Sequence, residues 1–73
     1  MDLKIIGNRI KFIRINSLNL SQEGFADKLG LSRAYISRVE SGKQNITLES
    51  LIKICAGLNI TLRDFFDVEK IDF

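Results

Sequence analysis

Apolar residues recur along the chain at intervals of three and four, the spacing that places side chains on one face of an α-helix. The pattern predicts a first helix over about 3–17. Its apolar stripe is formed by Ile6, Ile10 and Ile13, with Phe12 beside it. The chain contains no proline, and no strand-like alternation runs far. The fold class expected from these periods is all-α.

Four further helices are predicted, each preceded by a Ser or Thr. A hydroxyl at this N-cap position accepts a hydrogen bond from a backbone N–H that would otherwise have no partner in the first turn. The expected N-caps are Ser21, Ser32, Thr47 and Thr61. Asp64, three residues after the last of these, would complete a capping box.

The predicted segments end at residues that accept the left-handed conformation. Asn19 should end the first segment, Gly30 the second and Gly42 the third, while Gly57 lies near the end of the fourth. The remaining apolar positions of the predicted helices are Phe25, Ala26, Leu29, Leu48, Leu51, Ile52, Cys55, Leu58, Leu62, Phe65 and Phe66. We therefore expect residues 1–73 to form one domain of five short helices.

The third helix, within LSRAYISRVESG at 31–42, has an unusual polar face. At 100° per residue, Ile36 and Val39 share the buried edge. The opposite face carries Arg33, Ala34, Ser37, Arg38 and Ser41, with Tyr35 at one flank and Glu40 at the other. Small side chains allow a backbone to approach DNA base edges, and arginine can bond the O6 and N7 atoms of guanine.

The connection before this helix supports the same interpretation. The second predicted helix ends at Gly30, and the third begins about two residues later. A short glycine-containing turn between steeply crossed helices is the helix-turn-helix arrangement, which places its second helix in the major groove. The helix-turn-helix is predicted over about 21–41.

The charge distribution and the lack of metal-ligating residues limit the functions that the chain can have. The net charge is only +2, but residues 1–45 hold eight Lys and Arg against four Asp and Glu, whereas residues 46–73 hold three against five. The first part can therefore face a polyanion. The chain has no histidine and a single cysteine, Cys55, so we expect neither a metal site nor a catalytic centre, and no cofactor. Cys55 is expected to be a small core residue.

From residue 6 to about 66 the sequence resembles the lambda-repressor/Cro type of helix-turn-helix domain. The resemblance rests on the Ser-Gln that opens the second helix, on the Leu-rich fourth helix, and on Ala26, Gly30, Ile36, Val39, Glu40 and Gly42. Within this family, RAYISRVESGKQNITLESL looks most like the controller proteins of restriction–modification systems, which are small homodimeric transcription regulators. One departure is that Arg14 is followed by INSLNLSQ, one residue longer than the family pattern and with Asn19 in place of Gly.

The resemblance implies roles for individual residues. Base reading is implied for Arg33, Ala34, Tyr35, Ser37 and Arg38. Contact with DNA phosphates is implied for Ser21, Gln22, Ser32, Ser41, Lys43, Gln44 and Asn45. A partly buried ion pair is implied for Arg14 and Glu40.

Each role has a plainer alternative. The arginines can be a solvated face, and Ala34 can be present only as a good helix former. Tyr35 can pack its ring with only its hydroxyl exposed. Gln22 can be no more than a helix-start residue.

The C-terminal part carries more large apolar side chains than a monomer of this size can obviously bury. They include Ile71 and Phe73 in the tail. We therefore expect a dimerisation region over about 47–73. The interface residues expected are Ile52, Leu62, Phe65 and Phe66.

The sequence thus predicts a non-enzymatic transcriptional regulator that binds duplex DNA as a homodimer on a near-palindromic operator. The alternative is an antitoxin or another protein-interaction module with the same fold. No small-molecule effector is expected. No segment approaches the ~20 apolar residues of a membrane helix, and the start does not read as a signal peptide, so a cytoplasmic, nucleoid-associated protein of a bacterium or phage is expected.

Overall fold

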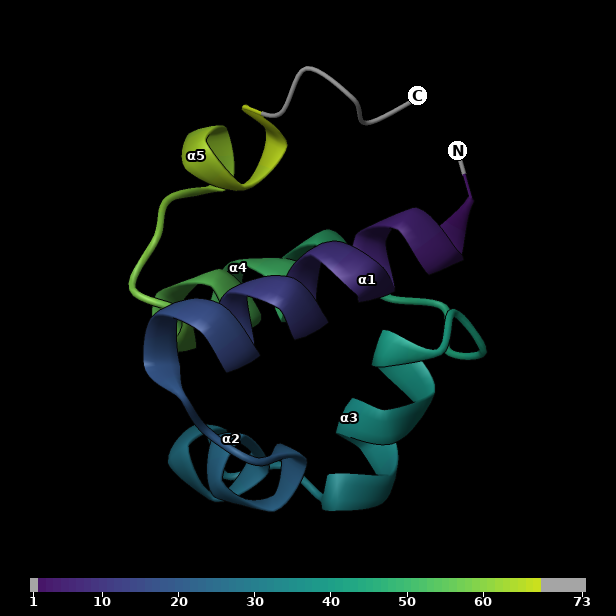
Figure 1. Cartoon of the computed structure of the whole chain (residues 1–73). Helices are drawn as coiled ribbons and strands as arrows, with labels where there is room; N and C mark the ends of the chain where they lie inside the picture. Colours follow the sequence, from purple (N-terminus) through teal and green to yellow (C-terminus); the bar gives the residue numbers. More distant parts are fainter. Residues whose placement is uncertain (1, 68–73) are drawn as a thin grey trace.

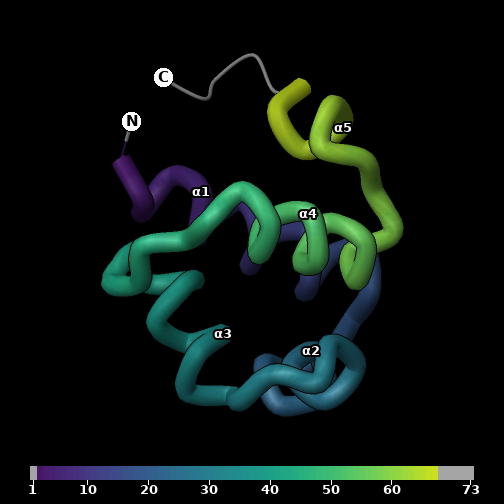
Figure 2. The backbone as a smooth tube through the Cα atoms, turned by 180° about the vertical axis from the view of Figure 1, so that it is seen from behind, coloured from purple at the N-terminus to yellow at the C-terminus, as the bar shows by residue number. Residues whose placement is uncertain are grey.

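The computed structural model describes residues 2–67, and the tail residues Ile71 and Phe73 lie outside that range. Five α-helices and one π-helical turn follow one another in this range, and no strand occurs within it. Their bounds are α1 (Leu3–Ile13), η1 (Arg14–Leu18), α2 (Gln22–Leu29), α3 (Arg33–Glu40), α4 (Leu48–Gly57) and α5 (Leu62–Phe66). Figures 1 and 2 show α1 and α4 across the middle of the molecule, with α2 and α3 on one side and α5 on the other. The predicted all-α, five-helix fold is confirmed.

The predicted N-caps are all present. The hydroxyl oxygens of Ser21, Ser32, Thr47 and Thr61 each accept a hydrogen bond of 3.0 Å from the backbone N–H three residues on. The predicted helix ends are confirmed as well, since the left-handed residues after η1, α2 and α3 are Asn19 (φ 52), Gly30 (φ 69) and Gly42 (φ 76). Local sequence therefore accounts for the starts of α2 to α5 and for the ends of η1, α2 and α3.

A single apolar core joins all five α-helices. Its thirteen buried apolar residues are Ile6, Ile10, Ile13, Phe25, Ala26, Leu29, Ile36, Val39, Leu51, Ile54, Cys55, Leu58 and Phe65. The predicted stripe of α1 is confirmed by its three isoleucines, whereas Phe12 beside it is 60% exposed. Cys55 is a core residue, as expected, and burial raises the pKa of its thiol.

One predicted interface residue is part of the core instead. The Phe65 side chain is 0% exposed, so it is not available to a partner, and its assignment to the dimer interface is wrong. Its ring packs edge-to-face against Phe66, with 5.1 Å between ring centroids. The half-buried Arg9 of α1 donates from Nε to the Phe65 carbonyl oxygen at 3.1 Å, and this bond links α5 to α1.

The segment after Arg14, which the resemblance indicates is one residue longer than the family pattern, forms η1. Here the helix widens into a π-turn, in which the backbone N–H of Asn19 reaches back five residues to the carbonyl of Arg14. The first helical segment thus runs to residue 18, close to the predicted end at about 17. The widened turn lets Arg14 remain buried while the chain still enters α2 at Ser21.

Two glycines allow backbones to approach where any side chain would collide. A methyl group on Gly7 of α1 would lie 2.8 Å from the carbonyl carbon of Glu40, and closer still to the carbonyl oxygens of Val39 and Glu40. A methyl group on Gly42 would lie 2.8 Å from the backbone nitrogen of Lys4, at a φ that side chains disfavour. These contacts set the C-terminal end of α3 directly against α1.

Candidate nucleic-acid interface

The α2–turn–α3 unit has the geometry predicted for a helix-turn-helix. The turn is closed by a backbone hydrogen bond of 2.9 Å from Leu31 N to the Ala26 carbonyl, and α3 begins directly after the Ser32 cap. Ala26 is 1% exposed, and its small side chain lets α2 pack closely on the neighbouring helices. Figure 1 shows α2 and α3 meeting at an angle at one end of the molecule, away from α5.

The outer face of α3 is polar and mostly short-chained. Ile36, Val39 and Glu40 are buried, so the helix is fixed to the core along one edge. The predicted base-reading residues are exposed, apart from the half-buried Tyr35, and they share the opposite face: Arg33, Ala34, Ser37 and Arg38. The structure therefore brings these four residues and Tyr35 together on one side of the domain. The Tyr35 ring is partly packed against the core, which agrees with the plainer alternative for this residue.

The residues predicted to contact phosphates differ in exposure and in whether their donor groups are already hydrogen-bonded. Lys43 and Asn45 are exposed in the loop after α3. Ser21 and Ser32 use their hydroxyl oxygens to cap α2 and α3, so only their hydroxyl hydrogens remain to donate. The Ser41 hydroxyl donates to the Arg38 carbonyl oxygen at 3.1 Å. The loop therefore carries the donors that are most accessible to a phosphate.

The predicted ion pair between Arg14 and Glu40 is present and bidentate. Arg14 donates from Nε to Glu40 Oε2 at 2.7 Å and from Nη2 to Glu40 Oε1 at 2.8 Å. The third nitrogen, Nη1, donates to the Leu20 carbonyl oxygen at 2.7 Å. Among residues 2–67, no buried side-chain nitrogen or oxygen lacks a partner. The pair thus joins η1 to α3 and to the entry of α2.

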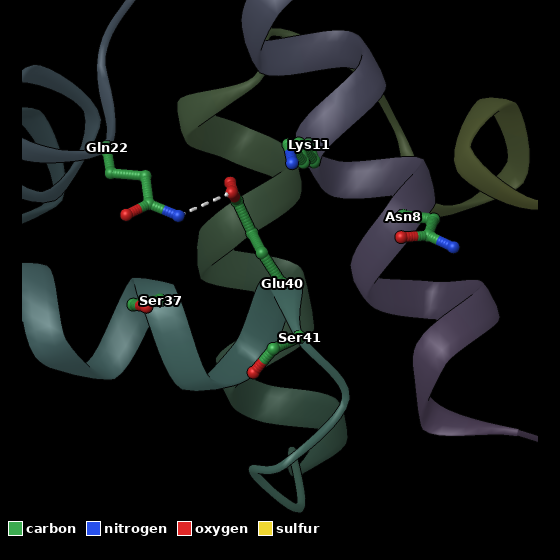
Figure 3. Close-up of a pocket in the computed structure, with 6 residues that line it drawn as sticks. All are labelled: Asn8, Lys11, Gln22, Ser37, Glu40 and Ser41. Atoms are coloured by element: carbon green, nitrogen blue, oxygen red, sulfur yellow. Dashed lines mark hydrogen bonds between the residues drawn. The ribbon is translucent and has the colours of Figure 1, made fainter.

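Gln22 belongs to the same network. Its Nε2 donates to Glu40 Oε1 at 3.0 Å, as Figure 3 shows, so one of its two amide hydrogens is committed within the domain. The sequence predicted a phosphate contact for Gln22, and one amide hydrogen remains for such a contact. Sequence reasoning missed the bond to Glu40, because it depends on how α2 and α3 cross.

A polar pocket of about 230 Å³ lies beside this network, where α1, α2 and α3 meet. Figure 3 shows its lining, which consists of Asn8, Lys11, Gln22, Ser37, Glu40 and Ser41. The two α1 residues, Asn8 and Lys11, were not among the predicted site residues. Asn8 and Lys11 are three residues apart, so they share the side of α1 away from the isoleucine stripe. This spacing is the sequence signal that could have indicated a shared polar site.

Arg38 and Gln44 make a further side-chain contact at the end of α3. Arg38 Nε donates to Gln44 Oε1 at 3.0 Å, and Gln44 Nε2 donates to the Asn45 carbonyl oxygen at 3.1 Å. Gln44 is half-buried, in contrast to the exposed Lys43 beside it. The Gln44 amide is therefore held by two hydrogen bonds within the protein.

Comparison with known proteins agrees with this geometry. The model of a family described as helix-turn-helix matches residues 10–65, most of the chain. This chain belongs to the helix-turn-helix family. Within that family it is similar to control protein C.MunI of a Mycoplasma species, with 49% identity over 71 residues that cover 94% of this chain and 96% of that protein.

Solved structures of helix-turn-helix proteins are similar in fold and sequence. The restriction-modification controller protein C.AhdI from Aeromonas hydrophila matches with a TM-score of 0.81 and 37% identity, covering 89% of this chain and 97% of that one. The controller protein C.Esp1396I, solved as a tetramer with its natural 35 base-pair operator, matches with a TM-score of 0.80 and 38% identity over 88% of this chain and 83% of that one. At these identities the chain belongs with the controller proteins.

Within the part of the chain that the structure describes, no helix has the length and apolar character needed to cross a membrane.

Proposed function

We propose that this protein is a sequence-specific, duplex-DNA-binding regulator of transcription, of the kind that controls restriction–modification systems. The observation that carries the proposal is the outer face of α3, where exposed arginines flank small side chains on a helix whose other edge is buried. The controller protein C.Esp1396I is bound to its operator in its solved structure, which supports the same role for this chain. The role is one of binding and regulation, with no catalytic step.

In this proposal α3 enters the major groove and reads base edges. Ala34 and Ser37 keep the helix backbone close to the bases, because their side chains are short. Arg33 can bond guanine, and the Ser37 hydroxyl can donate or accept. These contacts specify the sequence, and contacts to the phosphates set the position of the protein on the duplex.

Phosphate contacts would come from both sides of α3. Lys43 and Asn45 in the following loop are exposed donors, and Lys43 adds a positive charge. On the other side, Gln22 retains one amide hydrogen at the start of α2. Such contacts release counterions from DNA, so binding should weaken as salt rises.

We propose that the protein acts as a homodimer through the side of the domain formed by α4 and α5. Ile52 is 50% exposed and Leu48 is 65% exposed, which is unusual for large apolar side chains in α4. Leu62 and Phe66 of α5 are half-buried, and Phe66 also lines an apolar pocket of about 250 Å³ with Leu48. Two copies joined there would read half-sites about 34 Å apart on a near-palindromic operator. We propose that the homodimer acts in the cytoplasm of a bacterial cell.

The experiment that tests this function is selection of bound duplexes from a random-sequence pool at near-physiological salt. We expect an enriched palindrome whose two halves are separated by about one helical turn. One enriched half-site without symmetry would retain the role of α3 and remove the homodimer. Binding that enriches no sequence and is abolished by moderate salt would contradict the proposed function.

A further inference from the structure

The contact between Arg38 and Gln44 carries an inference about how one base pair is read. The two residues lie in different elements, α3 and the loop after it, and their side chains are joined by the 3.0 Å bond from Arg38 Nε to Gln44 Oε1. The Gln44 amide is itself oriented, because its Nε2 donates to the Asn45 carbonyl at 3.1 Å. With its nitrogen committed there, the amide presents its oxygen to Arg38.

The backbone of the loop sets this geometry. After α3 the chain turns back on itself at Gly42, whose φ is 76. The backbone N–H of Lys43 donates to the Arg38 carbonyl at 2.9 Å, which closes the turn. The lack of a side chain at Gly42 lets the loop lie against the backbone of Lys4. Gln44 therefore follows a hydrogen-bonded turn that lies directly against the start of α1.

The bond decides which part of the guanidinium is free. Arginine has one N–H on Nε and two on each Nη, all in one plane. Since the Nε–H of Arg38 is given to Gln44, the side-on pair formed by Nε and one Nη is blocked. The end-on pair formed by Nη1 and Nη2 remains, and two parallel N–H groups suit the O6 and N7 acceptors of guanine. Arg33 differs, because none of its side-chain nitrogens has a hydrogen-bond partner among residues 2–67.

We propose that Gln44 is a positioning residue that presents Arg38 end-on to a guanine, and so sets specificity at one base pair of each half-site. The proposal rests on the proposed function, since it requires α3 in the major groove. It replaces the phosphate contact that the resemblance implied for Gln44. The bond to Gln44 restricts the Arg38 side chain before DNA binds, so less conformational entropy is lost when Arg38 contacts a base. The preference for guanine is therefore larger than an arginine without such a bond would give.

The test repeats the duplex selection with the full chain carrying Arg38→Ala, Gln44→Ala or Gln44→Glu. Arg38→Ala should lose a guanine preference at one position of each half-site. Gln44→Ala should weaken the preference at that same position by about 2–10-fold, the range expected for one net hydrogen bond. Gln44→Glu should restore it, because a carboxylate also accepts from Nε. Lys43→Ala is the matched control, and it should leave the preference at that position unchanged.

A second measurement tests the contact on the duplex selected by the unmodified protein. Replacement of that guanine by 7-deazaguanine removes the N7 acceptor, so it should weaken binding by the unmodified protein more than binding by Arg38→Ala. If Gln44→Ala instead weakened all duplexes equally, or changed nothing, Gln44 would be a phosphate contact or a bystander and the inference would be overturned. A pool from which the unmodified protein enriches no sequence would overturn the proposed function as well, so the two failures are distinguishable.

Discussion

Substitution of Glu40 by Ala tests the internal network most directly. The Glu40 carboxylate accepts three hydrogen bonds, two from Arg14 at 2.7 and 2.8 Å and one from Gln22 at 3.0 Å. The side chains of Arg14 and Glu40 are 6% and 2% exposed, respectively. Truncation would therefore leave a buried guanidinium with two donors unpaired, although its bond to the Leu20 carbonyl would remain.

The expected loss of stability is large for a domain of this size. Removing one partner of a buried ion pair costs about 3–5 kcal/mol, because the remaining charge has lost its compensation. Small domains have total unfolding free energies of only about 5–15 kcal/mol. A loss of 1 kcal/mol lowers the Tm of such a domain by about 4–8 °C, so Glu40→Ala should lower the Tm by at least roughly 12 °C.

Thermal unfolding followed by far-ultraviolet circular dichroism is the measurement. The matched control is Glu49→Ala, which removes an exposed glutamate from the first turn of α4 and should cost no more than about 1 kcal/mol. A double variant, Arg14→Met with Glu40→Leu, should lose less than Glu40→Ala, because it leaves no unpaired charge. A Tm for Glu40→Ala within a few degrees of the unmodified protein would refute the structural role assigned to the pair.

The remaining predictions concern three other features of the domain. Arg33→Ala should reduce discrimination among sequences by ~1–3 kcal/mol, whereas Lys43→Ala should weaken binding to all duplexes alike and flatten the salt dependence; equal, sequence-blind losses in titrations would contradict the base-reading role. Gly7→Ala should cost about 1–3 kcal/mol in urea unfolding, because its methyl group would collide with the end of α3; unchanged stability would refute that close approach. Burial raises the pKa of the Cys55 thiol, so the protonated thiol contributes fully to the free energy of unfolding below the ordinary thiol pKa of about 8.5. This contribution is lost as the pH rises toward the higher pKa of the thiol in the folded state. The urea midpoint should therefore fall between pH 8 and pH 10 by more in the unmodified protein than in Cys55→Ala, and equal falls would exclude this contribution.

Helix positions were predictable from the sequence because they depend on neighbouring residues. A capping hydroxyl such as Ser32 bonds a backbone group three residues away, so no tertiary information is needed to expect it. The left-handed residues Asn19 and Gly42 are predictable for the same reason. The buried edge of α3 follows from the 3.6-residue period, which placed Ile36 and Val39 together.

The one wrong assignment, that of Phe65 to the dimer interface, arises where a local pattern leaves two solutions. In the five-residue helix α5, Phe65 and Phe66 are adjacent, and the period of so short an element does not decide which ring points inward. The docking of α5 on α1 and α4 decides it, and Phe65 is buried.

Other features were missed because they join separate elements. The bonds from Gln22 to Glu40 and from Arg38 to Gln44 depend on a helix crossing and on a loop path. The pairing of Arg14 with Glu40 was expected only from the resemblance to a known family, because no spacing in a single chain links residues 26 apart. The bases that the candidate residues read are a prediction for the duplex selection, and their phosphate contacts are a prediction for the salt dependence of binding.

The π-turn η1 gives the domain a place where its length can change. The widened turn lies within Arg14–Leu18, while the isoleucine stripe of α1 before it and the cap of α2 after it have ordinary helical geometry. Arg14 begins this turn and Leu20 follows it, and the bond between them spans the turn. Deletion of one residue here should therefore narrow a single turn to α-helical width, and we expect the exposed face of α3 to keep its shape.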